Sequence, residues 1–370
     1  MKQTECPGTK VDDVLRLNPL VRIRFDGDVR IDLPLQRREF RLDDVDLLAA
    51  LPAIVDGGTV SESVSALLGA DLADTELSAV HLIEQLISAE LVTRSESVPD
   101  GWDAAQHWID RGWLDALLFH AACETDYFVG DGADDPDDLH DELLRKDVSH
   151  GLPTVWTRYD QRPIIDLPTG RAFDDLPPLE TVLLNRRSNQ RWRSPSGPPF
   201  ADIATVLRLA SEETVAVRRR MEKDIGKHPS ALLHSAYTAL ELYLVVHQVP
   251  GMDPGLYHYE PDMERLRQLR KGPLRKEMQR MCVGQRRAAT AGALFVITAT
   301  WDRYMRRYPQ PSGYRTLMVN VGELAHKLVV LSTAVGLSTF ITPALDDAYA
   351  DSLFDMNPEI ESPIEVIGVG

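Results

Sequence analysis

Two arginines and a serine stand side by side at Arg186, Arg187 and Ser188, directly after the apolar run Leu179 to Leu184. Guanidinium groups donate forked, charged hydrogen bonds that suit a phosphate, and a short hydroxyl can complete the set of donors. An apolar run of this kind favours a helix, so the three residues would stand at a helix end. The triplet therefore predicts a phosphate-binding site, although such triplets also occur by chance on helix ends.

A second candidate for chemistry is the cluster Arg306, Arg307 and Tyr308. A nearby cation favours the phenolate form of a tyrosine, so Tyr308 could shuttle protons, whereas arginine does not give up its proton in proteins. The alternative is an ordinary surface loop between a buried strand and a long helix.

The sequence lacks the motifs of several large enzyme classes. It contains no GxGxxG after a strand, no GxxxxGK[ST], no HExxH and no GxSxG. Dinucleotide-binding Rossmann, P-loop, zincin and serine-hydrolase interpretations therefore lose their main support. His120 and Cys123 are spaced like metal ligands but have no matching second pair, so we expect no metal site.

Charge is distributed unevenly along the 370 residues, whose net charge is −17. Residues 1–180 hold 16 Lys and Arg against 37 Asp and Glu, whereas residues 181–370 hold 24 against 20, which indicates two units with different surfaces. So acidic a chain is a poor binder of nucleic acid or anionic membranes, and no run reaches the roughly 18 apolar residues of a membrane span. Three widely spaced cysteines fit a reducing compartment, so we expect a cytoplasmic protein.

The first part of the chain reads as a small α+β unit. A hairpin over residues 20–34, three helices between residues 43 and 91, and a returning strand at 91–93 resemble a winged-helix domain, with any small α+β module as the alternative. A single aromatic-rich helix over 108–120 follows, and then an acidic loop over 130–142.

The rest of the chain reads as a larger unit with one central sheet, which makes the fold class α+β. The periodicity predicts a short helix over 204–210 and a long helix over 318–335. Strands are predicted over residues 241–246, 255–259, 293–299 and 364–369. The segment 264–287 holds nine Lys and Arg against two acidic residues and is interpreted as a solvated helical surface, with an anionic partner as the alternative. The predicted domains are 1–100, an intervening helical and extended segment 101–178, and 179–370.

Taken in order along the chain, these landmarks resemble the SagB-type dehydrogenases, the thiazole/oxazole (azoline) oxidase branch of the nitroreductase family. The most specific piece is the stretch from Gly255 to Pro261, GLYHYEP, which is similar to the GLYHYDP strand of that family. Arg186-Arg187-Ser188 resembles the start of its RRSxRxF motif, and the N-terminal unit resembles its winged-helix, peptide-clamp-like domain.

The resemblance implies a nitroreductase-like FMN fold, with a central sheet flanked by helices, and a homodimer with FMN at the interface. It implies a peptide substrate, and a cyclodehydratase or another biosynthetic enzyme as a partner. The implied reaction is the two-electron dehydrogenation of a peptide azoline to an azole, in which a base removes a proton and the flavin accepts a hydride.

Carried over by position, the resemblance implies cofactor contacts from Arg186, Arg187, Ser188, Gln190, Ser235 and Thr342 and catalytic roles for Arg307 and Tyr308. Four features depart from the family pattern. Gln190 stands where the family has a basic residue, and Arg307 precedes Tyr308 where the family has lysine. The family's PSGG-like flavin loop is matched only imperfectly, by residues 229–232 or 234–236, and the segment that begins at Thr342 lacks the family's glycines. The departures leave two alternatives open: a catalytically degenerate scaffold of this fold that binds a peptide or partner enzyme, and an FMN dehydrogenase that acts on another peptide or tethered amino acid.

Overall fold

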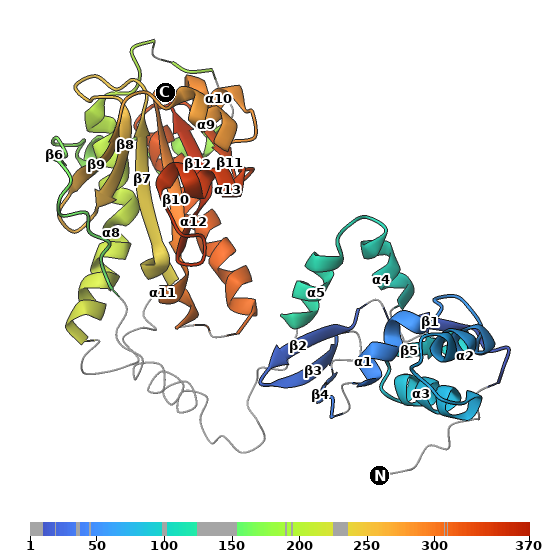
Figure 1. The fold of residues 1–370 in the computed structure, drawn as a ribbon. Helices are drawn as coiled ribbons and strands as arrows, with labels where there is room; N and C mark the ends of the chain where they lie inside the picture. The colour runs from blue at the N-terminus through green and yellow to red at the C-terminus, as the bar shows by residue number, and fades with distance from the viewer. Residues whose placement is uncertain are drawn as a thin grey trace. The chain divides into compact units, whose positions relative to one another are not determined.

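The computed structural model describes residues 10–18, 20–34, 38–43, 46–97, 102–123, 154–188, 191–193, 195–224, 236–306, 308 and 310–370. The chain divides into two compact units, Met1–Tyr127 and Phe128–Gly370 (Figure 1). Each unit has a hydrophobic core of its own.

The first unit is a small mixture of strands and helices. Three antiparallel strands form one sheet and two form another; they are β2 (Arg22–Asp26), β3 (Asp28–Leu33) and β4 (Arg38–Arg41), and β1 (Leu15–Leu17) with β5 (Val92–Arg94). The helices are α1 (Asp46–Ala50), α2 (Val60–Gly69) and α3 (Glu76–Ser88), with single 3-10 turns at Leu51–Ala53 and Ser95–Ser97. Ile31, Leu67 and Ile83 are fully buried in its core. The predicted hairpin, helices and returning strand are therefore confirmed.

The predicted single helix over residues 108–120 is wrong. Two helices stand there, α4 (Trp102–Ile109) and α5 (Leu114–Ala122). Gly112 separates them with a φ of +72°, a left-handed conformation that glycine adopts at little cost and that ends a helix. The indole of Trp108 contacts Trp113 across the break, with ring centroids 5.9 Å apart.

The second unit is built on a seven-stranded sheet in the order β11-β12-β10-β7-β8-β9-β6, in which neighbouring strands are antiparallel. Its strands are β6 (Ile164–Asp166), β7 (Leu240–Val246), β8 (Gly255–Glu260), β9 (Arg265–Lys271), β10 (Ala293–Thr300), β11 (Thr339–Thr342) and β12 (Glu361–Val369). Its helices are α7 (Leu179–Asn185), α8 (Phe200–Asp224), α9 (Arg275–Met281), α10 (Arg286–Thr290), α11 (Trp301–Met305), α12 (Ser312–Ala334) and α13 (Asp347–Phe354), with 3-10 turns at Phe173–Asp175 and Ala236–Ala239.

Side chains alternate between the two faces of this sheet, and helices cover both faces (Figure 1). On one face Leu244 and Phe295 pack with residues of α8 and α12. On the other face Val245 and Val296 pack with residues of α9 and α13. The predicted α+β class, with a central sheet flanked by helices, is therefore confirmed.

Two expectations for this unit are wrong. The helix predicted over 204–210 is longer and extends from Phe200 to Asp224 as α8. The prediction was too short because Ser211, Thr214 and Arg218 are polar but buried on the inner face of the helix, so they interrupt the apolar periodicity of the sequence. The basic segment 264–287 is not one solvated helix. It holds β9 and two short helices, and Arg267 of β9 is only 5% exposed. Within the described part of the chain, no helix has both the length and the apolar character needed to cross a membrane.

Candidate functional site

The predicted phosphate residues lie at the C-terminal end of α7. The guanidinium of Arg187 donates to the backbone carbonyls of Leu184 at 2.9 Å and Arg186 at 2.8 Å. Since the last carbonyls of a helix lack partners within it, Arg187 caps α7. Arg186 is half-buried, and its Nη1 lies 3.4 Å from the hydroxyl of Ser188. Arg186 is therefore the better placed of the two arginines to bind a ligand together with Ser188.

Ser188 joins this motif to β11, the edge strand of the sheet. It forms a parallel bridge with Thr339, whose hydroxyl donates to the carbonyl of Arg187 at 3.0 Å. Three residues farther along the same strand, the buried hydroxyl of Thr342 accepts hydrogen bonds from the side chain of Gln285 at 2.8 Å and from the amide of Ala344 at 3.1 Å. The structure thus brings Ser188, and through it Arg186, next to the edge strand that contains Thr342.

Tyr308 belongs to a different part of the unit. It is half-buried, its ring lies 5.0 Å from that of Tyr304, and a Cβ added to Gly313 would come within 2.7 Å of its own Cβ. Tyr308 is therefore fixed between the end of α11 and the first turn of α12.

The register of the sheet separates Tyr308 from the phosphate residues. Thr339 pairs with Val369, which pairs with Ala293 at the start of β10, whereas α11 begins at Trp301 immediately after β10 ends. At about 3.3 Å per residue, the length of β10 amounts to roughly 23 Å. A single chain therefore does not bring Tyr308 and Ser188 to one site. Arg307, Gln190 and Ser235 lie outside the described residues.

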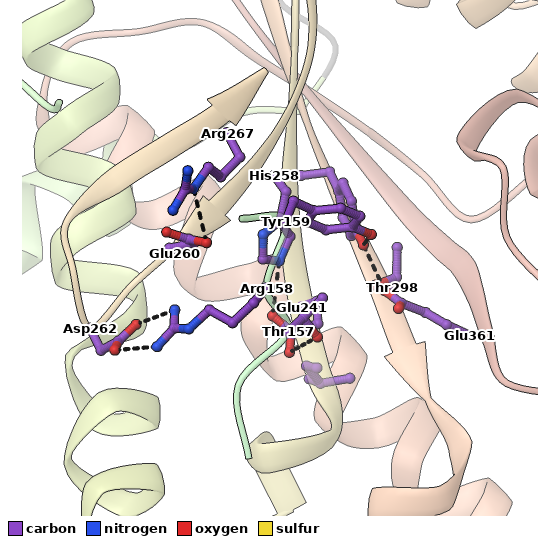
Figure 2. A network of polar contacts seen from close by, with 12 residues as sticks. Thr157, Arg158, Tyr159, Glu241, His258, Glu260, Asp262, Arg267, Thr298 and Glu361 are labelled. Atoms are coloured by element: carbon purple, nitrogen blue, oxygen red, sulfur yellow. Dashed lines mark hydrogen bonds and ion pairs between the residues drawn. The ribbon is translucent and has the colours of Figure 1, made fainter. Parts of the chain in front are cut away.

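A buried polar network, which the sequence did not predict, lies elsewhere on the sheet (Figure 2). The carboxylate of Glu241 on β7 forms an ion pair with Arg303, lies 3.1 Å from Nη2 of Arg218 and lies 3.3 Å from Nε2 of His258. All four side chains are at most 2% exposed. Burial alone would raise the pKa of Glu241, but the charges of Arg218 and Arg303 hold it well below its usual range.

The network fastens residues 154–162, which we call the strap, onto β7 and β8. Thr157 donates to Glu241 at 3.0 Å and accepts from Arg303 at 3.0 Å. Arg158 forms a two-point ion pair with Asp262, at 2.9 and 2.5 Å, and the hydroxyls of Tyr159 and Tyr243 lie 2.9 Å apart. The strap then continues into β6, which pairs with β9.

A second carboxyl, Glu361 on β12, closes the network. Its Oε1 accepts hydrogen bonds from Tyr243 at 3.1 Å and from Thr298 at 2.5 Å, and burial, with the charge of Glu241, raises the pKa of Glu361. Burial likewise raises the pKa of Tyr159 and Tyr243. These groups bond mainly to one another, so the network's chemistry is suited to holding the strap rather than to transforming a ligand.

The GLYHYEP stretch, the most specific sequence signal, takes part in this network. His258 bonds to Glu241, and Glu260 pairs with Arg265 and Arg267 of β9. The ring of His258 lies 5.1 Å from Tyr159 and 4.9 Å from Tyr243. In this chain the motif therefore holds the strands and the strap together. The only sequence signal for this role is the presence of charged residues within a predicted strand.

No family model matches the chain, but the chain is similar to curated proteins. It is 26% identical over 349 residues to the trifolitoxin operon protein TfxC of Rhizobium leguminosarum, a match that covers 90% of this chain and 94% of that protein. It is 28% identical over 169 residues, 46% of this chain and 80% of the relative, to a Methanocaldococcus jannaschii protein named as a nitroreductase. The trifolitoxin-processing protein TfxB of R. leguminosarum is 26% identical over 221 residues, 57% of each chain.

Solved structures also align with the chain. A protein of Anabaena variabilis described as a nitroreductase aligns with a TM-score of 0.46 and 19% identity, over 60% of this chain and 44% of that one. This chain therefore spans less than half the length of that protein. A chain of the Escherichia coli microcin synthetase McbBCD complex, solved with truncated pro-MccB17 bound, aligns with a TM-score of 0.40 and 16% identity, over 75% of this chain and 98% of that one.

Proposed function

We propose that this chain is an FMN-dependent oxidoreductase in the biosynthesis of a peptide natural product. The observation that carries the proposal is the similarity to the trifolitoxin operon protein, which spans 90% of this chain and so includes parts of both units. The similarity to a protein named as a nitroreductase supports the redox class. The similarity to a trifolitoxin-processing protein supports a peptide as the substrate.

The donor groups at the edge of the sheet fit the phosphate of FMN. Arg186 supplies a forked cation and Ser188 a hydroxyl 3.4 Å away, a combination that suits phosphate oxygens. Thr342 lies three residues farther along the strand to which Ser188 is bridged. Because side chains alternate along a strand, it faces the other side from Thr339, so we propose it as a contact of the cofactor apart from the phosphate. FMN, when bound, supplies the two-electron redox chemistry, while these residues hold and orient it.

A homodimer would complete the site, and the surface of the second unit supports one. α7 packs against α12, and both helices expose large apolar side chains; these are Leu179, Leu183, Leu184, Tyr314 and Val319, between 47% and 67% exposed. A Cβ added to Gly322, near the middle of α12, would meet nothing within 4 Å. Two copies of α12 could therefore approach closely about a twofold axis.

A twofold axis across α12 would pair the two copies of this helix antiparallel. This pairing would also overcome the separation of Tyr308 from Arg186 and Ser188 within one chain. α12 begins beside Tyr308 and ends shortly before β11. Its 23 residues span roughly 35 Å at about 1.5 Å per residue. Antiparallel contact along this length would bring the partner subunit's Tyr308 toward Arg186 and Ser188 of the first copy.

Within this site we propose the dehydrogenation of a peptide azoline to an azole. Tyr308 would accept the proton from the substrate ring, and for Arg307, which precedes it in the sequence, we propose the catalytic role that the resemblance implies. Arg186 and Ser188 would fix the cofactor so that the substrate ring stays aligned with it.

The test is to purify the chain and measure flavin absorbance, and then to supply an azoline-containing peptide. Retained FMN, flavin reduction on mixing, and loss of two hydrogens from the peptide by mass spectrometry are the expected results. If the purified chain is colourless and takes up no added FMN, the proposal is wrong. If flavin is reduced only by a peptide without an azoline, the redox class stands and the substrate changes.

The separation of Tyr308 from Ser188 within one chain favours a second candidate, a scaffold without redox chemistry that binds a peptide or partner enzyme. A monomer in solution that binds the peptide, and whose flavin, if any, no substrate reduces, would support the scaffold. Flavin reduction by any substrate would exclude it.

A further inference from the structure

The guanidinium of Arg287 lies over an indole ring at the end of the sheet where β10 begins. Its Cζ is 4.6 Å from the centroid of the Trp192 ring, and the indole nitrogen of Trp192 donates to the hydroxyl of Thr290 at 2.9 Å. A guanidinium stacked on an aromatic face keeps its N–H donors in its own plane, where they can form a fork toward an anion. The stack therefore presents Arg287 as a preorganised donor.

Two of these donors lack an acceptor. Nε and Nη2 of Arg287 are buried and have no hydrogen-bond partner within the described ranges, and burial lowers the pKa of Arg287. A buried cationic donor without an acceptor costs folding free energy, and an anion that binds there recovers it. The structure thus contains an unused forked cation, which is the chemistry of an anion site.

Arg287 is attached to the same end of the sheet as the predicted phosphate residues. Gln285, at the start of α10, donates to Thr342 on β11 at 2.8 Å. Trp192 follows Ser188 by four residues and lies on the last residues of β12 and the chain end, where a Cβ added to Gly370 would come within 3.1 Å of its ring. Arg287 therefore lies two residues from Gln285, which bonds to Thr342, and stacks on Trp192, which is four residues from Ser188.

We propose that Arg287, held on Trp192, is a further phosphate-binding residue, which binds the same phosphate monoester as Arg186 and Ser188. The identity of that monoester as FMN rests on the proposed function, whereas the phosphate chemistry of the site does not. A free phosphate or another phosphorylated ligand would use the same donors.

The experiment compares Arg287→Met with Arg287→Lys and with the matched control Arg286→Met. Methionine keeps an unbranched stem over Trp192 and removes the charge, lysine keeps the charge without the fork, and Arg286 is an exposed neighbour on the same helix. Binding of FMN and of riboflavin, which lacks the phosphate, is measured for each variant by fluorescence. Thermal unfolding is measured in phosphate and in chloride at equal ionic strength.

For Arg287→Met we expect FMN to bind about ten- to a hundredfold more weakly, the scale of a lost charged hydrogen bond, with riboflavin binding unchanged. Arg287→Lys should lie between the extremes, and Arg286→Met should match the original chain. Equal losses for FMN and riboflavin, or no loss for either, would overturn the inference and leave Arg287 as a support for Trp192.

The phosphate arm separates this inference from the proposed function. If the original chain binds neither flavin, the FMN proposal fails. Stabilisation by inorganic phosphate that disappears in Arg287→Met would still support the anion site. Absence of any phosphate stabilisation in such a flavin-free chain would refute the site as well. If Arg287→Met does not fold, the comparison of FMN with riboflavin is made on Arg287→Lys.

Discussion

Replacement of Glu365 by glutamine probes a buried carboxyl that the rest of the sheet leaves poorly paired. Glu365 lies on β12 opposite Ile297 of β10 and is 8% exposed. Its Oε1 has no hydrogen-bond partner among the residues described. Burial raises the pKa of Glu365 from 4.5 to about 7, because the charged form is poorly solvated there.

The sign of the effect follows from linkage. The folded chain retains the proton to a higher pH than the unfolded chain, so Glu365 makes the free energy of unfolding fall as pH rises from 4.5 to about 7. At about 1.4 kcal/mol for each tenfold change in proton affinity, the upper limit is roughly 3 kcal/mol. Since buried charges draw in water and relax their surroundings, we expect about 2 kcal/mol. Glu365→Gln should therefore be more stable than the original chain at about pH 8 and equal to it near pH 4.

The assay is urea unfolding across this pH range, followed by tryptophan fluorescence. Glu359→Gln, at an exposed position of the preceding loop, serves as the control and should change stability equally little at every pH. A constant difference between Glu365→Gln and the original chain from acid to alkaline pH would refute the reasoning. So would a lower stability of the variant above neutral pH, because it would mean that the carboxylate is paired.

Four further predictions follow from the contacts described. Glu241→Gln leaves two buried guanidiniums without their carboxylate and should cost about 3–5 kcal/mol of unfolding free energy at neutral pH; because the pKa of Glu241 is lowered, the deficit should shrink as pH falls below 4.5 in the same urea assay. Arg186→Ala should weaken FMN binding by about 1.5–3 kcal/mol in a fluorescence titration, whereas Arg187→Ala should mainly lower thermal stability because it removes the cap of α7; the reverse ranking would refute the assignment. Tyr308→Phe should retain its flavin but lose roughly a hundredfold or more in turnover, and near-original turnover would exclude Tyr308 as the base. Val319→Asp should convert a dimer to monomers in analytical ultracentrifugation, since it places a charge in the proposed apolar interface, and an unchanged dimer would move the interface elsewhere.

Much of the sheet could be predicted from local pattern. The run that became β10 is apolar from Ala293 to Ile297, as expected for a strand covered on both faces. The runs that became β7, β8 and β12 are mainly apolar but include charged residues. β11 was not predicted, because four residues between a long helix and a turn carry little periodic signal. β9 was misread because its arginines look solvated in the sequence, whereas Arg267 is neutralised inside the unit by Glu260.

The candidate site was predicted only in its local parts. Arg186 and Ser188 are two residues apart in the sequence, so their suitability for binding phosphate can be predicted without knowledge of the fold. Ser188 contacts Thr339, which is about 150 residues farther along the chain. Thr157 contacts Glu241, which is 84 residues farther along. Such pairings depend on sheet order, which a single sequence does not specify. For the same reason, the separation of Tyr308 from Ser188 could be found only once the register was known.

The two outer strands of the seven-stranded sheet, one of which continues from the strap, have a consequence for the solubility of the chain. Both outer strands of the seven-stranded sheet are short, since β6 has three residues and β11 has four, whereas the longest strands, β10 and β12, lie inside. Long outer strands offer unpaired backbone groups to other chains and promote aggregation. β6 covers part of β9, and the bridge from Ser188 covers the start of β11. Substitutions that loosen the strap or the Ser188 bridge would therefore promote self-association through exposed strand edges as well as weaken binding.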